Sequence, residues 1–256
     1  MNIHFKDITL FEKLNKSTLA KIRVGSHVYG NSTERSDNDY LYIYATSDNE
    51  LNSFIIVNHQ LQFKEDNIDH NFVSLHTFLR NAINGDSTIN IESIFSNELK
   101  GTSLEWITKY KNSFVTYSNI RSYLGFARRD LKFISHGDDY TKRKRKGHIV
   151  RGYTYAKNML SGNFDFDLSN KEFISYDLDL FDKNEWSVKI DSLRKELNEK
   201  LNNNELNLAR NMDVKSSKLL NNELFEFINS DFYKKKKLVD FDIEMYLDSF
   251  ENWVSY

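Results

Sequence analysis

The chain has 256 residues, enough for one large domain or two small ones, and its formal net charge of −2 indicates no polyanion-binding surface at the level of the whole molecule. It contains no cysteine, which excludes disulfides and thiolate metal sites, and no proline, so its turns depend on Gly, Asn, Asp and Ser. The N-terminus lacks the apolar core of a signal peptide and no apolar run is long enough to cross a bilayer, so we expect a cytoplasmic protein that does not bind membranes.

Residues 1–97 alternate between strand-like and helical patterns. The run YLYIYA alternates in the way a strand does, whereas apolar residues recur at helical spacing from Leu75 to Ile83 and stop before Gly85. The elements expected in this part are a helix at 8–21, strands at 21–26, 40–45, 53–63 and 68–75, and a helix at 75–83.

From residue 98 onward, nearly every apolar pattern has helical spacing. Four stripes predict helices, at 120–134, 149–160, 186–201 and 243–254. We therefore expect two domains, an α/β unit at 1–97 followed by a helical unit at 98–256.

The stretch VGSHVYGNSTERSDNDYLYIY, residues 24–44, combines features suited to phosphate chemistry. A strand that ends at Val24 leads into Gly25 and Ser26, where a tight turn would let phosphate approach the backbone and the serine hydroxyl. If a helix follows, its unpaired N–H groups would add to the attraction for an anion. Gly-Ser turns are common, so this feature alone has little weight.

Two aspartates, Asp37 and Asp39, stand just before the strand at 40–45. Residues two apart in a strand point to the same face, so the two carboxylates would lie together and repel each other. A divalent cation removes the conflict, and Mg²⁺ prefers carboxylates together with substrate phosphates. A phosphate-binding turn beside such a pair predicts the transfer of a nucleotidyl or phosphoryl group.

The order of these features resembles the DNA polymerase β-type nucleotidyltransferase superfamily. The family pattern of a hydrophobic residue, Gly, Gly or Ser, a short spacer and Asp-x-Asp is similar to Val24, Gly25 and Ser26, ten further residues, and Asp37-Asn38-Asp39. Within the superfamily, the chain is most similar to predicted nucleotidyltransferases linked to RNA repair in bacteria and phages, over roughly residues 20–165. The resemblance implies an α/β (α+β) core with a small mixed sheet, followed by a helical C-terminal region.

The resemblance also implies roles for particular residues. Asp37 and Asp39 would hold two Mg²⁺ ions, and the turn at Gly25 and Ser26 would hold the phosphates of an NTP. A third carboxylate completes such sites, and Asp69 is our candidate for a catalytic and metal-binding residue, with Asp66 as the alternative. An ordinary turn or helix-capping role for Asp69 is also open.

Further matches lie beyond the first carboxylates. Glu92, in NIESIFS, is similar to a family element with Glu, and Lys146, His148 and Arg151 are similar to a Lys-x-His-x-x-Arg helix, which would bind nucleotide. The chain departs from the family where Asp86-Ser87 replaces an Asn-Pro pair. This difference puts the shape of that loop in doubt and leaves the metal site unaffected.

A basic run at 142–146 precedes His148 in the sequence. If the helix is regular, His148, Arg151 and Tyr155 form a stripe separate from the apolar one, which could bind triphosphate or RNA phosphates. A solvated helix start is the alternative interpretation of the basic run. The second basic cluster, YKKKKL, is interpreted as a plain surface run.

These features predict an enzyme that moves a nucleoside monophosphate from an NTP to an acceptor hydroxyl, with RNA, and tRNA first, as the expected acceptor. One alternative is a nucleotidyltransferase that modifies a protein or small molecule, similar to AMP-transferring antitoxins or antibiotic adenylyltransferases. Another is a non-catalytic nucleotide- or RNA-binding module, which the intact Asp37 and Asp39 disfavour. Frequent Asn, Lys and Ile are typical of AT-rich genomes such as those of phages or low-GC bacteria, and for a phage protein the location would be the host cytoplasm.

Overall fold

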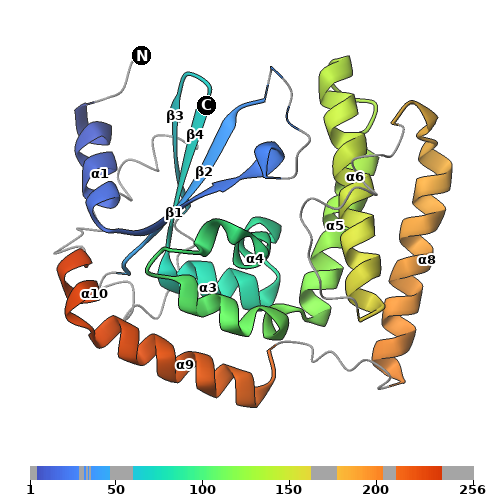
Figure 1. Cartoon of the computed structure of the whole chain (residues 1–256). Helices are drawn as coiled ribbons and strands as arrows, with labels where there is room; N and C mark the ends of the chain where they lie inside the picture. Colours follow the sequence, from blue (N-terminus) through green and yellow to red (C-terminus); the bar gives the residue numbers. More distant parts are fainter. Residues whose placement is uncertain are drawn as a thin grey trace.

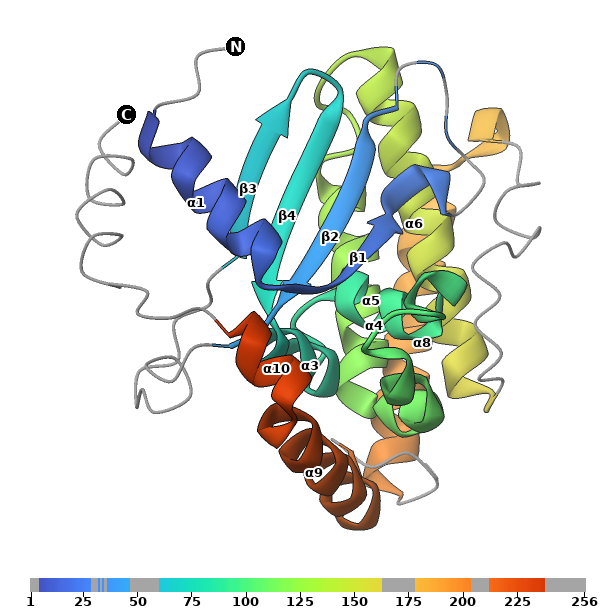
Figure 2. The same cartoon turned by 60° about the vertical axis from the view of Figure 1, so that its left-hand side comes forward.

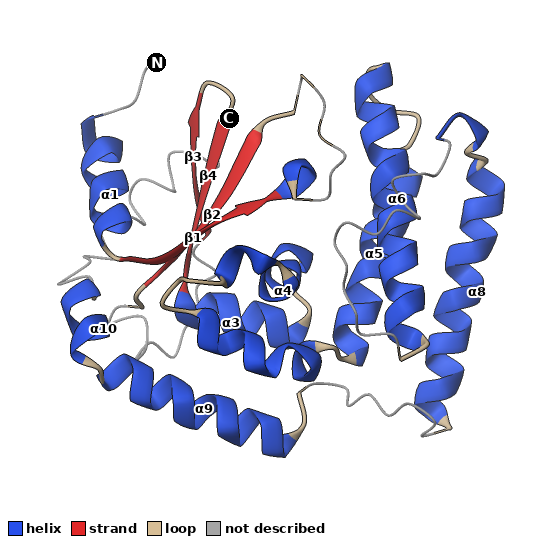
Figure 3. Cartoon of the chain, in the orientation of Figure 1, coloured by secondary structure: helices blue, strands red, loops and turns tan. Residues whose placement is uncertain are grey.

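The computed structural model describes residues 5–28, 32, 34, 36–46, 60–162, 178–203 and 212–237. An α/β unit with one sheet is followed by a helical region (Figures 1 and 3). The N-terminal elements are α1 (Phe5–Lys16), β1 (Thr18–Val24), η1 (Gly25–His27), β2 (Asn38–Tyr44), β3 (Gln60–Glu65), β4 (Ile68–Ser74), α3 (Leu75–Asn84) and α4 (Thr88–Phe95). They are followed by η2 (Asn97–Leu99), η3 (Glu105–Phe114), α5 (Tyr117–Lys132), α6 (Asp139–Leu160), η4 (Leu178–Leu180), α8 (Lys183–Asn202), α9 (Val214–Asn229) and α10 (Asp231–Lys236).

The sheet has the strand order β1-β2-β4-β3, with β2 and β4 parallel and the outer pairs antiparallel. The expected small mixed sheet followed by helices is therefore confirmed. In this register Asp39 lies between Val24 on β1 and Asp69 on β4. The hairpin between β3 and β4 turns at Asp66, which has a left-handed φ of 48°.

The first predicted helix is too long at its C-terminal end. The helix ends at Lys16, and Thr18–Lys21 belongs to β1, which pairs with β2. Backbone pairing with β2 and burial of Leu19 and Ala20 outweigh the helical pattern of the local sequence. On one face of the sheet, α1 packs Leu14 into a small cluster with aromatic residues of β2 and β4 (Figure 2).

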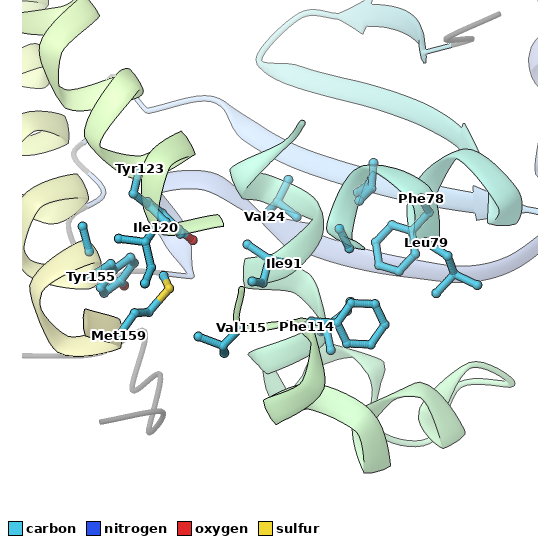
Figure 4. Close-up of a cluster of buried hydrophobic side chains, with 14 of the residues drawn as sticks. Val24, Phe78, Leu79, Ile91, Phe114, Val115, Ile120, Tyr123, Tyr155 and Met159 are labelled. Atoms are coloured by element: carbon cyan, nitrogen blue, oxygen red, sulfur yellow. The ribbon is translucent and has the colours of Figure 1, made fainter. Parts of the chain in front are cut away.

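The other face of the sheet belongs to the main core, which extends from the sheet into the helices. Val24 on β1 shares this core with Ile91 on α4, Phe114 on η3 and Tyr123 on α5 (Figure 4). The core therefore crosses the proposed domain boundary at residue 98, and the division into 1–97 and 98–256 stays a prediction.

In the helical region, α5 and α6 form an antiparallel pair with α8 beside it (Figures 1 and 2). The helices predicted at 120–134, 149–160 and 186–201 are confirmed within α5, α6 and α8, except that α5 ends at Lys132, and most of their apolar residues are buried. The helix predicted at 243–254 and the first part of the strand predicted at 53–63 lie outside the described residues. None of the helices within the described part of the chain has the length and apolar character needed to span a membrane.

Candidate active site

The turn after β1 lies directly against the first candidate carboxylate. Gly25 has a φ of +76°, and a Cβ added there would overlap Oδ2 of Asp39 and lie 3.1 Å from its Cγ. The backbone at Gly25 thus closes over the Asp39 carboxylate. The element that follows is η1, a 3-10 helix of three residues, so the helix expected to attract phosphate contributes only one short turn.

Three carboxylates gather at the end of the sheet where β2 and β4 begin. Asp39 faces Asp69 across the parallel strands, and Asp37 lies exposed just before β2. Burial raises the pKa of Asp39, and the negative charges of Asp69 and, to a smaller degree, Asp37 raise it further. Lys144 and His27 act in the opposite direction without reversing the shift in this pKa. Asp39 therefore holds its negative charge at a cost that a bound cation would reduce.

Asp69 has partners on the strand beside it. Its Oδ2 lies 3.2 Å from Nζ of Lys64 and accepts a hydrogen bond from Nε2 of Gln62 at 3.0 Å. Within the described ranges, no three Asp, Glu, His or Cys side chains are arranged as a metal-binding group. Asp66 lies at the exposed tip of the β3–β4 hairpin, outside the Asp39–Asp69 register pair.

Another polar group lies in the η1 turn. His27 acts on the charge of Asp39, and its Nε2 atom is buried without a hydrogen-bond partner within the part of the chain that the structure describes. A buried polar atom of this kind costs free energy unless a ligand or water satisfies it. The η1 turn therefore holds an unsatisfied polar nitrogen close to Asp39.

The helix α6 carries the basic residues predicted to bind nucleotide. Nδ1 of His148 lies 2.8 Å from Oδ2 of Asp130 on α5. Burial lowers the pKa of His148, and the positive charges of Arg151 and Lys144 add to the effect, while Asp130 opposes it. At neutral pH the ring is therefore uncharged, with Asp130 fixing its orientation.

Asp130 is a residue that the sequence analysis did not single out. Burial by itself would raise its pKa, but hydrogen bonding to His148 and the charge of Arg129 outweigh this and lower the pKa. The carboxylate also accepts bonds from Nε and Nη2 of Arg129, both at 3.2 Å. The only indication in the sequence is an acidic residue in the last turns of an otherwise basic helix.

The basic residues of α6 point toward two different parts of the molecule. Lys144 acts electrostatically on both Asp39 and His148. Lys146 instead donates from Nζ to the carbonyl oxygen of Leu178 at 2.9 Å and lies 5.7 Å from the centre of the Phe181 ring. Residues four apart share a helix face and residues two apart do not, so Lys144 lies on the face of His148 and Lys146 does not.

The stripe expected to continue from His148 is partly buried. Arg151 is only 7% exposed, and Tyr155 is packed edge-on against Tyr123. The expectation that this stripe lies apart from the apolar face is therefore wrong for its second half, because α5 covers it. Arg151 lies 5.9 Å from the ring centre of Phe126, beside the His148 ring.

Glu92 has a contact within the core. It is buried on α4 and accepts a hydrogen bond from the hydroxyl of Tyr123 at 3.0 Å. This bond joins α5 to α4, which packs on the face of the sheet opposite α1. Glu92 therefore connects the α/β unit with the helical region.

No protein-family model matches the chain, and no curated protein matches it. Among solved structures, the chain is similar to a nucleotidyltransferase-like protein from Exiguobacterium sibiricum 255-15, with 12% sequence identity over 76% of this chain and 73% of that one. The TM-score is 0.27, so this likeness carries no functional conclusion for the chain.

Proposed function

We propose that the protein is a nucleotidyltransferase of the DNA polymerase β type, which moves a nucleoside monophosphate from an NTP to an acceptor hydroxyl and releases pyrophosphate. The observation that carries the proposal is the position of Asp39. Its carboxylate lies under the backbone of Gly25, across from Asp69 and close to Asp37. A glycine turn and clustered carboxylates at one sheet end are the two features that such a reaction needs.

The chemistry of Asp37, Asp39 and Asp69 suits divalent cations, although within the described residues the three side chains are not arranged as a metal-binding group. The raised pKa of Asp39 reflects burial and neighbouring negative charge, both of which a cation would offset. Asp37 and Asp39 would hold the ions. Asp69 would also bind them after its ion pair with Lys64 breaks, and this pair is weak because Lys64 is 66% exposed. When bound, Mg²⁺ would neutralise the triphosphate and lower the pKa of the attacking hydroxyl.

The chain's own groups would orient the nucleotide. Backbone and hydroxyl donors at Gly25 and Ser26 would bind the phosphates, and Lys144 would bring positive charge to the same place. His148, held neutral and oriented by donation from its Nδ1 to Asp130, would accept a hydrogen bond at Nε2 without adding charge. Lys146 would contribute less than the sequence analysis expects, because it contacts Leu178.

RNA is the acceptor that we propose, with a tRNA end first among RNAs. The support is the basic composition of the α5–α6 region on a chain whose net charge is −2. Residues 121–146 contain nine Lys and Arg against three Asp and Glu. A local positive charge of this size favours a polyanionic acceptor over a small neutral one.

Replacement of either metal-binding candidate tests the proposal. Asp37→Asn or Asp39→Asn should lower transfer from labelled NTPs to cellular RNA by about a hundredfold or more, since several kcal/mol of transition-state stabilisation act through the cations. Asp66→Asn, at the exposed hairpin tip, is the matched control and should retain activity. Transfer within a few-fold of wild type in Asp39→Asn would rule out the assignment, and labelling of protein in place of RNA would change the acceptor.

A further inference from the structure

A cleft of about 520 Å³ opens between the C-terminal half of α5 and the start of α8, beyond the candidate active site. Its lining includes Arg128, Arg129, Lys132 and Lys183, with Leu131 and Phe133 supplying apolar surface. Among the described residues that line this α5–α8 cleft, none carries a carboxylate. Basic and apolar side chains together suit a ligand that has both an anionic group and an apolar group.

Most of the positive charge in the α5–α8 cleft is available to a ligand. Arg128 is 57% exposed and lies 3.8 Å from Asp191, an exposed ion pair that contributes little and exchanges readily. Within the described residues, Lys132 and Lys183 have no carboxylate partner. Only Arg129 is held firmly, by Asp130 and at 4.9 Å from the Phe126 ring centre. A chain of phosphates could therefore displace water and counterions here without breaking buried pairs.

An aromatic side chain stands beside these charges. Phe133 is 41% exposed although it is a large apolar residue, and Nζ of Lys132 lies 5.6 Å from its ring centre. Arg145 donates to the carbonyl oxygens of Phe133 and His136, which holds the α5–α6 turn in place. An exposed ring in a basic groove, on a backbone held in place, is an arrangement on which bases of a single strand can stack.

Arg129 connects the lining of the cleft to residues of the candidate active site through a series of side-chain interactions. This residue lines the α5–α8 cleft and binds Asp130, which holds His148, and Lys144 acts on both His148 and Asp39. We propose that the α5–α8 cleft binds a single-stranded polynucleotide through its phosphates and one stacked base. The role of this cleft as the path by which an acceptor end reaches Asp39 rests on the proposed function. The binding of a single strand to the cleft does not.

The test is binding without NTP or metal. A fluorescein-labelled single-stranded RNA of about 12 nucleotides, within the usual range of site sizes for single-strand binders, is titrated by anisotropy from 50 to 200 mM KCl. Arg128→Ala/Lys132→Ala should flatten the dependence of log K on log salt by about 1.4, two contacts at about 0.7 each. Lys234→Ala/Lys235→Ala, which removes the same charge from exposed positions on α10, should leave affinity and slope unchanged.

Stacking is tested separately at Phe133. Phe133→Ala should weaken RNA binding by about fivefold or more, and Phe133→Tyr should restore it, because a tyrosine ring also stacks. Single-stranded DNA of the same sequence shows whether the 2′-hydroxyl matters, and a duplex of equal length should bind more weakly. Equal effects of the cleft and α10 variants, no RNA binding by wild type, or duplex binding that is stronger than single-strand binding would overturn the proposal.

The binding test separates the cleft from the catalytic assignment. If the RNA binds as expected while no NTP is ever transferred, the α5–α8 cleft stands and the nucleotidyltransferase proposal fails. If transfer depends on Asp39 but the cleft variants bind RNA like wild type, the reverse holds. Each result therefore bears on one proposal alone.

Discussion

At Gly25 the backbone combines a φ of +76° with direct apposition to the Asp39 carboxylate. A side chain at this position would be strained and would also displace a candidate metal ligand. Gly101 has nearly the same φ, +77°, but a Cβ there would meet nothing within 4 Å. Substitutions at the two glycines therefore distinguish the effect of backbone strain, which both positions share, from the effect of the contact with Asp39, which only Gly25 has.

Gly25→Ala should reduce transfer activity by about a hundredfold, because misplacement of a reacting group by about 1 Å has an effect of this size. Gly101→Ala should lower stability by about 1–2 kcal/mol from strain alone and retain activity. Steady-state kinetics and thermal unfolding of both variants check the prediction. Equal activity losses in the two would show that the turn at Gly25 has only a structural role.

The carboxylate of Asp39 makes stability depend on pH in a particular direction. Since its pKa is raised in the folded protein, the ionised form destabilises the fold above that pKa, and the effect disappears once the group is protonated in both states. Asp39→Asn should therefore raise the melting temperature at pH 7 in EDTA, by about 2–4 °C for each kcal/mol relieved, and the gain should vanish towards pH 4. Asp66→Asn serves as the control, and a pH-independent difference in the Asp39 variant would contradict the prediction.

Among the elements, α6 carries its basic side chains on different faces, because residues two apart in a helix point in different directions. Lys144 acts on Asp39 at the carboxylate end of the sheet, and His148 contacts Asp130 on α5, whereas Lys146 reaches Leu178. Lys142 and Arg143 have carboxylate partners of their own, Asp139 and Asp179. The run of five basic residues is therefore not one uniform patch.

Lys144→Ala should raise the KM for NTP by about fivefold, since one partly solvated charge near a triphosphate contributes about 1 kcal/mol. Lys146→Ala removes the same charge two residues away and should change this KM little. Initial rates at varied NTP check the pair. An identical response of the two variants would mean that position on the helix does not matter, and that the run acts only through its total charge.

For the whole molecule, one main core links the sheet to the helical region. Phe114 is fully buried on η3 in the same core as Val24 of β1 and Met159 of α6 (Figure 4). The bond from Tyr123 to buried Glu92 adds a polar link across the proposed boundary at residue 98. We therefore expect the two parts to unfold together.

Phe114→Ala should lower the free energy of unfolding by about 3–5 kcal/mol and leave a single transition. Urea unfolding followed by tryptophan fluorescence reports on Trp106, Trp186 and Trp253, all beyond residue 98, and hydrogen exchange reports on β2. Phe225→Ala, at a side chain that is 67% exposed, should have little effect. Protected amides in β2 after the fluorescence change is complete would show two independently folding units.

Features that depend on neighbours along the chain can be predicted from the sequence alone. The spacing of Gly25, Ser26, Asp37 and Asp39 predicted which residues to place together, and the apolar stripes predicted α5, α6 and α8. The choice of Asp69 over Asp66 also came from its place at the start of a strand-like run. The periodicity of apolar residues and the residue types that favour turns are local properties, so they can be recognised without knowing the fold.

Tertiary structure decided what depends on residues far apart in the chain. The strand at Thr18–Lys21 exists because β2 pairs with it, Asp130 matters because α5 brings it to His148, and the α5–α8 cleft exists only where two helices meet. That Lys144 acts on Asp39 while Lys146 contacts Leu178 follows from the way α6 packs against its neighbours. None of these relations has a signature in local spacing, because each is set by packing between segments that the chain order does not place together.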